Sequence, residues 1–217
     1  YRMQSKVIIF TTAILIIVPA LYFFFFEFSD LTLGKRVLVS LFQSVTPRTA
    51  GFNTVDASEL SETGNVVVTT LMLIGGAPGS TAGGMKVTTF AVLLATTVAV
   101  FAKQDDAHIF ARRIGNAIVK NAATILLMYV SLFTLGAMII SSIEGLPITQ
   151  CFYETASAIG TVGLTTGITP TLGSVSKIIL IFLMYMGRAG VLTIVFATKN
   201  NVQKNVVKYP LETITVG

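Results

Sequence analysis

The sequence predicts an all-α membrane protein built from two tandem units, each with a span, a short re-entrant helix, a glycine-centred loop and a second span. Three observations predict this fold class. Apolar residues make up 53% of the 217 residues and charged residues 12%, and the mean hydropathy is +0.79, which leaves too little polar surface for a water-soluble globule. Several apolar runs reach about 20 residues, enough to cross a ~30 Å hydrocarbon layer as a helix. The same order of elements occurs twice along the chain.

The first unit begins with a span at residues 7–26, in which Pro19 is expected to cause a kink but not a break. Residues 37–45 are apolar but too short to span, so they predict a re-entrant helix that Pro47 ends. This helix leads into a loop with the sequence Arg48-Thr49-Ala50-Gly51-Phe52-Asn53-Thr54.

The second span of this unit is interrupted. Residues 66–74 are apolar, residues 75–84 are rich in glycine, and the apolar pattern resumes over residues 87–102. Irregular backbone inside a membrane is tolerated only where protein buries it or where it lines a watery cavity. The break is therefore expected beside an internal pathway. Polar residues 103–113 join the two units.

The second unit repeats this order. Residues 117–140 predict a full span and residues 148–159 a second short helix. The loop that follows, residues 159–167, reads Ile-Gly-Thr-Val-Gly-Leu-Thr-Thr-Gly. Residues 175–197 predict the last span, and residues 199–217 form a polar tail.

An internal repeat relates the two units. Shifting the sequence by 112 residues superposes Thr49 on Thr161, Gly51 on Gly163 and Gly75 on Gly187. The same shift places Leu71-Met72 on Leu183-Met184. A repeat of the whole unit makes chance a poor explanation for any single motif. It divides the chain into one unit at residues 1–112 and a second at residues 113–217.

Basic and acidic residues lie at opposite ends of the predicted spans. The positive-inside rule assigns to the cytoplasm the polar stretches that contain Arg2, Lys6, Lys103, Arg112, Arg113, Lys120, Lys199, Lys204 and Lys208. The other side holds an acidic rim that attracts cations, formed by Glu27, Asp30, Asp56, Glu59, Glu62 and Glu144. Three basic residues are exceptions on that side: Lys35, Arg36 and Lys177. The basic residues form no face with interleaved aromatics, so nucleic acid is not an expected partner.

No constellation of side chains indicates an enzyme. Cys151 is the single cysteine and His108 the single histidine, and no nucleophile–base set, paired carboxylates or metal-ligand cluster stands out. Cys151 is expected to be buried, and His108 is expected in a solvated loop. We expect neither catalysis nor an organic cofactor on this chain.

The two glycine-centred loops have the composition of a cation filter. Thr161, Val162 and Gly163 can present their carbonyl oxygens on one side, because glycine accepts backbone angles closed to other residues and carries no Cβ. Such a row can replace the hydration shell of an alkali cation. An ordinary tight turn is the alternative, and the repeat disfavours it.

These motifs resemble the Trk/Ktr/HKT superfamily of potassium transporters. The resemblance rests on Thr-Ala-Gly-Phe-Asn at 49–53, Thr-Val-Gly-Leu-Thr at 161–165 and Gly-Arg-Ala-Gly at 187–190. The loop at 75–84 and Tyr-Pro-Leu-Glu at 209–212 are similar to the bacterial Ktr membrane subunit in particular. The resemblance implies four such units around one pore, of which this chain supplies two. It implies K+ as the transported ion, with Na+ as a second candidate.

Carried over by position, the resemblance implies a filter of backbone carbonyls from eight residues: Thr49, Ala50, Gly51, Phe52, Thr161, Val162, Gly163 and Leu164. Potassium channels have Tyr-Gly after Thr-Val-Gly, where this chain has Leu-Thr and Phe-Asn. That departure predicts weaker discrimination between potassium and sodium than in a strict channel.

The resemblance also implies an intramembrane gating loop beneath the filter, made flexible by Gly75, Gly76, Gly79, Gly83 and Gly84. A charge in an apolar span costs roughly 2.5 to 3.5 kcal/mol, so Arg188 is expected to face a pore, water or a carboxylate. The resemblance places it below the filter, with the loop. At that position its positive charge slows cation flux. Close helix packing through the G-x-x-x-G spacing is one alternative. A phosphate-binding loop is excluded, because Met85 separates the last glycine from Lys86.

Two charged residues beside the loops suggest a brace. Arg48 directly precedes the first loop, and Glu154 lies in the second short helix. An unpaired charge at that depth is costly, so our hypothesis is that they pair between adjacent units and support the filter. The alternative is that each faces the outer vestibule separately.

For partners, the family implies a homodimer of membrane subunits in the plasma membrane, seated on a cytosolic ring of KtrA-like, nucleotide-binding regulatory subunits. A secondary cation symporter with discontinuous helices, binding sodium at residues 75–84, is the alternative function. Inverted repeats would support that alternative. Both predicted units begin and end in the cytoplasm, so they are parallel, which favours a pore.

Overall fold

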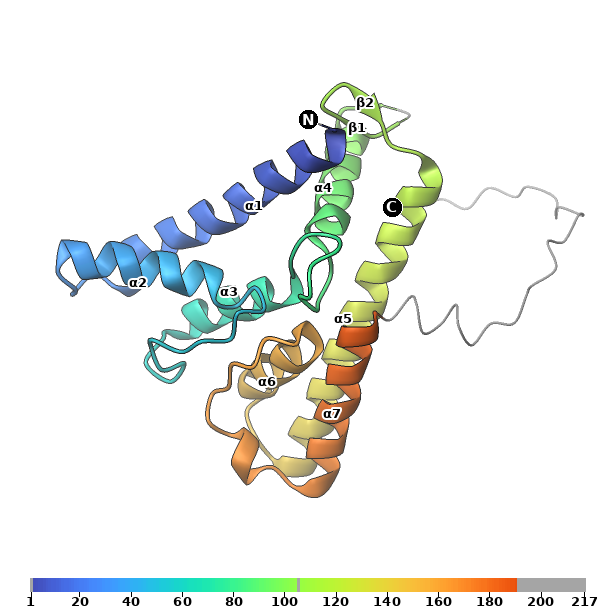
Figure 1. Ribbon diagram of the computed structural model, residues 1–217. Coiled ribbons are helices and arrows are strands. Elements are labelled where there is room, and N and C mark those ends of the chain that lie inside the picture. Colours follow the sequence, from blue (N-terminus) through green and yellow to red (C-terminus); the bar gives the residue numbers. More distant parts are fainter. Residues whose placement is uncertain (1, 105, 191–217) are drawn as a thin grey trace, which may run out of the picture.

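The computed structural model describes residues 2–104 and 106–190, and it is mostly helical, as predicted (Figure 1). One π-helical turn, one 3-10 turn and one two-stranded hairpin accompany seven α-helices in the described ranges. In chain order the elements are α1 (Met3–Tyr22), η1 (Phe23–Glu27), α2 (Leu33–Val45), α3 (Glu62–Leu73), α4 (Val87–Phe101), β1 (His108–Ile109), β2 (Arg112–Arg113), α5 (Asn116–Glu144), α6 (Ile148–Gly160), η2 (Thr169–Thr171) and α7 (Ser174–Ala189).

Two helices in the described part of the chain are long and apolar enough to cross a membrane: α1 continued by η1, and α5. Only 33% of the most apolar stretch of the first and 22% of that of the second is buried. Helices that are apolar on sides not covered by protein belong in lipid. Residues 74–86 separate α3 from α4, so the predicted interruption is confirmed. Beyond Gly190, the rest of the predicted last span and the polar tail lie outside the described residues.

The short helix α2 keeps its polar side inside. Ser40, Gln43 and Ser44 are buried, whereas Leu38 is 70% exposed. This is the reverse of a helix on the surface of a water-soluble protein, and it fits a bilayer. The helix begins at Leu33, four residues before the apolar run used to predict it.

A glutamate at the end of each long span caps the helix that follows the glycine-centred loop of the same predicted unit. Glu27 accepts hydrogen bonds from the backbone N–H of Ser61 and, at 2.9 Å, from its hydroxyl. Glu144 accepts from the N–H of Gly173 at 2.9 Å and from the hydroxyl of Ser176 at 2.5 Å. Ser61 and Gly173 are the N-cap residues of α3 and α7. A carboxylate there satisfies free N–H groups and is favoured by the helix dipole.

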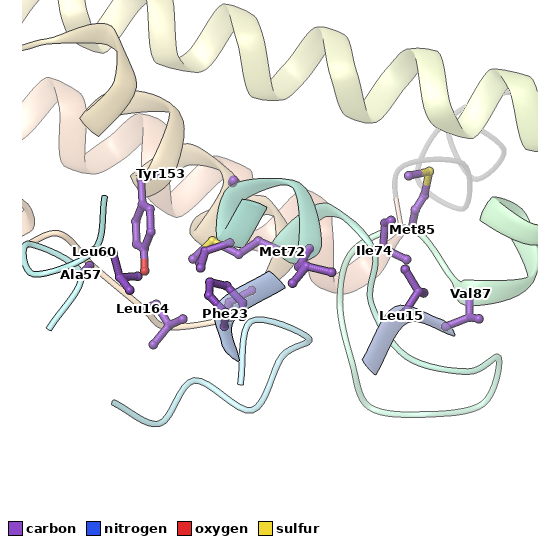
Figure 2. Packing of buried hydrophobic residues seen from close by; sticks show 14 of the residues in the cluster. Leu15, Phe23, Ala57, Leu60, Met72, Ile74, Met85, Val87, Tyr153 and Leu164 are labelled. Carbon is purple, nitrogen blue, oxygen red and sulfur yellow. The ribbon is translucent and has the colours of Figure 1, made fainter. Parts of the chain in front are cut away.

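The apolar core joins the two units. Figure 2 shows Tyr153 of α6 reaching toward Leu60 in the segment before α3, and Phe23 lying beside Met72. All four side chains belong to one buried cluster, with Leu164 from the loop after α6. Helix α6 is buried throughout its C-terminal half and packs against α3, α5 and α7. The second short helix is therefore enclosed among α3, α5 and α7.

The polar join between the units contains a hairpin. Strand β1 pairs antiparallel with β2, with His108 opposite Arg113. Phe110 and Ala111 form its turn with φ of 50° and 58°, as a two-residue hairpin turn requires. His108 is exposed and Cys151 is buried, both as predicted.

Candidate functional site

The loops after α2 and α6 share an unusual backbone conformation. Thr49 and Thr161 have φ of 68° and 52°, and Gly51 and Gly163 have φ of 74° and 94°. A positive φ is a genuine outlier for a β-branched residue such as threonine. These two pairs are the ones that the 112-residue shift superposes, so the sequence repeat is also a conformational repeat at these positions.

The two loops lie against each other. A Cβ added to Gly51 would overlap the carbonyl oxygen of Val162 and would lie 3.2 Å from its carbonyl carbon and 3.7 Å from the Cα of Gly163. Glycine is therefore required at position 51 for this approach. Gly51 and Gly163 lie close to each other, as a shared axis requires.

The carbonyl oxygens of both loops are available. Within residues 2–104 and 106–190 no group donates a hydrogen bond to the carbonyls of Thr49, Ala50, Gly51, Thr161, Val162 or Gly163. The amides are engaged instead: the N–H of Val162 donates to Ser157 O at 2.9 Å, and that of Gly163 to Ser157 Oγ at 3.2 Å. Because these amides bond back to the helix, the loop offers a ligand only carbonyl oxygens. Such oxygens can coordinate a metal cation.

The fourth predicted position differs between the loops. The carbonyl of Phe52 accepts a hydrogen bond from Thr46 Oγ1 at 2.6 Å, and its ring is 69% exposed. Leu164, at the matching place, is buried in the core cluster. The carbonyl of Phe52 is thus already engaged by protein.

The glycine-rich loop has a closed root and an exposed tip. In the root, residues 74–76 and 83–86, the N–H of Gly75 donates to Met85 O at 2.8 Å, and the N–H of Met85 to Leu73 O at 3.0 Å. A Cβ on Gly75 would overlap the carbonyl oxygen of Gly83. Gly76 is half-buried, and Gly84 is buried with φ of 69°. The root is therefore tightly packed and hydrogen-bonded through its backbone.

Two cations hold the tip, residues 77–82. The guanidinium of Arg188, in the last turn of α7, donates to Thr81 O. The ammonium of Lys86 donates to Ala82 O at 2.6 Å. Gly79 lies in the tip with φ of 88° and has no atom within 4 Å of an added Cβ. Arg188 therefore contacts the loop, beside which the resemblance places it. The contact of Lys86 was not predicted, although Lys86 lies only two residues after the last glycine of the loop.

Residues of both predicted filter loops contact the root. Thr161 Oγ1 accepts a hydrogen bond from the N–H of Gly83 at 3.1 Å, and Arg48 Nη2 donates to Gly75 O at 3.3 Å. A Cβ on Gly83 would lie 2.8 Å from Gly160 O. The root therefore packs directly beneath the loop after α6.

The predicted ion pair between Arg48 and Glu154 is wrong. Glu154 is 4% exposed. It accepts hydrogen bonds from the hydroxyls of Thr165 and Thr169, both at 2.5 Å, and from the N–H and hydroxyl of Thr166 at 2.9 and 3.1 Å. Threonines that follow Gly163 in the chain satisfy the carboxylate locally, so it needs no cation. Arg48 extends toward the glycine-rich loop instead.

Only some carboxylates of the acidic rim are free to attract cations. Glu27 and Glu144 cap helices, as described above. Asp56 is exposed, and the Ser58 N–H, 3.1 Å from Asp56 Oδ1, lowers the pKa of this carboxyl below its usual value. Asp56 therefore carries its negative charge to lower pH than a free aspartate.

Comparison with known proteins places the chain in one family. The TrkH family model, described as cation transport protein, matches residues 2–209. The chain is 40% identical over 226 residues to the potassium/sodium uptake protein NtpJ of Enterococcus hirae, covering 99% of this chain and 50% of that protein. It is 38% identical over 216 residues to the Ktr system potassium uptake protein B of Bacillus subtilis, covering 97% and 48%.

A solved structure shares the fold. The crystal structure of the potassium transporter TrkH from Vibrio parahaemolyticus matches with a TM-score of 0.73 at 20% identity, covering 90% of this chain and 44% of that one. At this identity the likeness concerns the fold alone. The chain spans about half the length of the curated relatives it matches.

Proposed function

The chain belongs to the TrkH family of cation transport proteins, which confirms the resemblance drawn from its motifs, and from this premise we propose that it forms half of a potassium-conducting pore. In this proposal the chain contains two tandem units of span, pore helix, filter loop and span, and two further units complete the ring. Potassium passes down its electrochemical gradient into the cell across the plasma membrane. No chemical step is involved.

One observation carries the proposal: two loops 112 residues apart share left-handed threonine and glycine positions and lie against each other with free carbonyl oxygens. The C-terminal ends of α2 and α6 precede these loops. Helix C-termini carry partial negative charge, which favours a cation there. Oxygens at fixed positions can then replace the water around potassium.

The selectivity proposed is moderate. The filter consists of Thr49, Ala50 and Gly51 with Thr161, Val162 and Gly163, and the outermost position is incomplete because the Phe52 carbonyl is bonded to Thr46. Fewer carbonyl sites predict weaker discrimination against sodium. The name of one relative, a potassium/sodium uptake protein, is in keeping with this proposal.

The gate proposed is the tip of the glycine-rich loop, not the whole loop. The root is held by backbone hydrogen bonds and close glycine contacts, so displacing it requires breaking several bonds at once. The tip is held mainly by Arg188 and Lys86. Both cations also repel a passing cation, so they slow flux while they stay in place. Opening then corresponds to release of the tip from these two side chains.

The alternative, a symporter that binds sodium at the helix break, is disfavoured by the same contacts. Carbonyls at the break already accept hydrogen bonds from Arg48, Lys86 and Arg188, at Gly75, Ala82 and Thr81. A sodium ion there would have to displace cationic side chains. Sodium coordination at this break is therefore unfavourable in the described conformation.

The partners proposed are lipid, a second copy of the membrane subunit and a cytosolic ring of KtrA-like, nucleotide-binding subunits. Relatives named as parts of a Ktr system support a transporter of more than one component. The basic cytoplasmic segments are the docking surfaces proposed for this ring. One of them, the tail at residues 199–217, lies outside the described residues.

The decisive experiment compares two serine substitutions, Gly163→Ser and Gly167→Ser. Both glycines are exposed, both have positive φ, at 94° and 91°, and neither has an atom within 4 Å of an added Cβ. Backbone strain is therefore matched, and only the position relative to the filter differs. The complete gene product is expressed in cells that lack other potassium uptake systems, and rubidium and sodium uptake are measured.

Gly163→Ser is expected to reduce rubidium uptake or its preference over sodium on the order of tenfold, the effect of ~1.4 kcal/mol. Gly167→Ser is expected to remain near the native value. If the two variants show the same rubidium uptake and the same preference over sodium at equal expression, Gly163 is not part of a filter.

A further inference from the structure

A hollow of about 440 Å³ lies at the predicted cytoplasmic end of the structure. Its lining comes from the start of α1 and from the hairpin that joins the two units (Figure 1). We call it the basic hollow, and it is lined by Arg2, Met3, Lys6, Phe110, Arg112 and Arg113. Neither the ion pathway nor the predicted gate uses any of these residues.

Among the described residues, the lining of the basic hollow gathers positive charge without a matching carboxylate. Four of the six described lining residues are cationic. One of them, Arg113, forms a salt bridge with Asp106 at 3.2 Å, the one ion pair found among the described residues. Arg2, Lys6 and Arg112 thus converge with no carboxylate bonded to them in the described ranges. Like charges held together favour occupation by an anion.

Apolar surface that suits lipid begins beside the hollow. One turn after Lys6, Ile9 is 62% and Phe10 59% exposed. The ring of Phe10 meets Phe110 edge-on with centroids 6.2 Å apart, and Phe110 is itself 48% exposed. The charged lining therefore meets a hydrophobic surface where α1 enters the bilayer, next to two aromatic rings. A ligand that fits both parts has an anionic head and an apolar tail.

We propose that the basic hollow binds the phosphate headgroup of an anionic phospholipid from the cytoplasmic leaflet. The phosphate accepts hydrogen bonds from Arg2, Lys6 and Arg112, and an acyl chain lies along Ile9 and Phe10. Basic pockets on the cytoplasmic side of membrane helices suit anionic headgroups in this way. A soluble phosphate would use the same cations but would gain nothing from the adjoining apolar surface.

The test is native mass spectrometry of the purified complete gene product, titrated in detergent with phosphatidylglycerol or phosphatidylcholine. The first variant carries Arg2→Gln, Lys6→Gln and Arg112→Gln. The control carries Lys103→Gln and Lys120→Gln, which remove two exposed charges from the same cytoplasmic region but lie outside the hollow. A second variant, Phe110→Ala, keeps every charge. Circular dichroism checks that each variant remains helical.

The native protein is expected to bind phosphatidylglycerol more tightly than phosphatidylcholine. Each neutralised cation is expected to weaken that binding about fivefold, and the control to leave it unchanged. Phe110→Ala is expected to weaken lipid binding as well. Native-like phosphatidylglycerol binding by the triple variant, or no preference over phosphatidylcholine in the native protein, would overturn the proposal. Displacement of the lipid by inorganic phosphate at equal concentration would also overturn it, in favour of a soluble anion.

Discussion

Arg188, in the last turn of α7, donates a hydrogen bond to the carbonyl oxygen of Thr81, which precedes it by 107 residues. The contact ties the last described helix of the second unit to the glycine-rich loop of the first. The position of the loop tip therefore depends on both units. A movement of α7 relative to α3 and α4 would move the donor away from its acceptor.

Replacing Arg188 with glutamine is expected to increase flux. The substitution removes a charge-assisted hydrogen bond, worth ~1.5 to 3 kcal/mol, and lowers the electrostatic barrier on the path. Maximal rubidium uptake should rise roughly tenfold, while the preference for potassium over sodium stays the same. Lys177→Gln is the control, because Lys177 is exposed and bonds to Pro170 O on the outer side. Reduced uptake at normal expression would indicate a packing role for Arg188.

Replacing Thr161 should change selectivity more than rate. Thr161→Val keeps the side-chain shape but removes the oxygen that accepts from the Gly83 N–H at 3.1 Å, whereas Thr161→Ser keeps that oxygen. A hydrogen bond of ~1 kcal/mol corresponds to about a fivefold effect. The valine variant should therefore lose about fivefold in preference for rubidium over sodium, measured by competitive uptake, and the serine variant should recover most of it. Equal selectivity of the two variants would show that the root does not support the filter.

Arg48 and Glu154 should behave independently. Because they contact different partners, Gly75 for Arg48 and the threonines after the filter for Glu154, neutralising both should cost the sum of the single costs. Thermal unfolding of Arg48→Gln, Glu154→Gln and the double variant in detergent measures this sum. Agreement within ~0.5 kcal/mol indicates independence. If the double variant loses markedly less stability than the two single variants together, Arg48 and Glu154 interact, and the ion-pair hypothesis would stand again.

The two capping glutamates should each contribute to stability. Glu27→Gln weakens the cap at Ser61, and Glu144→Gln weakens the cap at Gly173. Each is expected to lower the free energy of unfolding by ~1 kcal/mol, read as a lower unfolding temperature in detergent. Glu59→Gln is the control, because this carboxylate is exposed and caps no helix. An effect of Glu59→Gln equal to the other two would point to general surface charge.

Much of the architecture could be predicted because it depends on local sequence. Two long spans, two short helices and the break at residues 74–86 follow from the lengths of apolar runs and from glycine. The left-handed conformations at Gly51 and Gly163 follow from residue type and from the repeat. The partners of Arg48, Lys86 and Glu154 were not predictable in this way, because hydrogen-bonding reach across helices depends on how they pack.

The sequence by itself determined which segments are long and apolar enough to span a membrane, where the helices break and which two loops share the motif of the repeat, since hydrophobic length and glycine act within a few residues of chain. Only the tertiary structure decided that the loops touch, that the root and tip of the glycine-rich loop are held by different groups, and that Glu154 is satisfied by threonines. Those outcomes depend on the directions of buried hydrogen bonds, which are set when α3, α6 and α7 pack together.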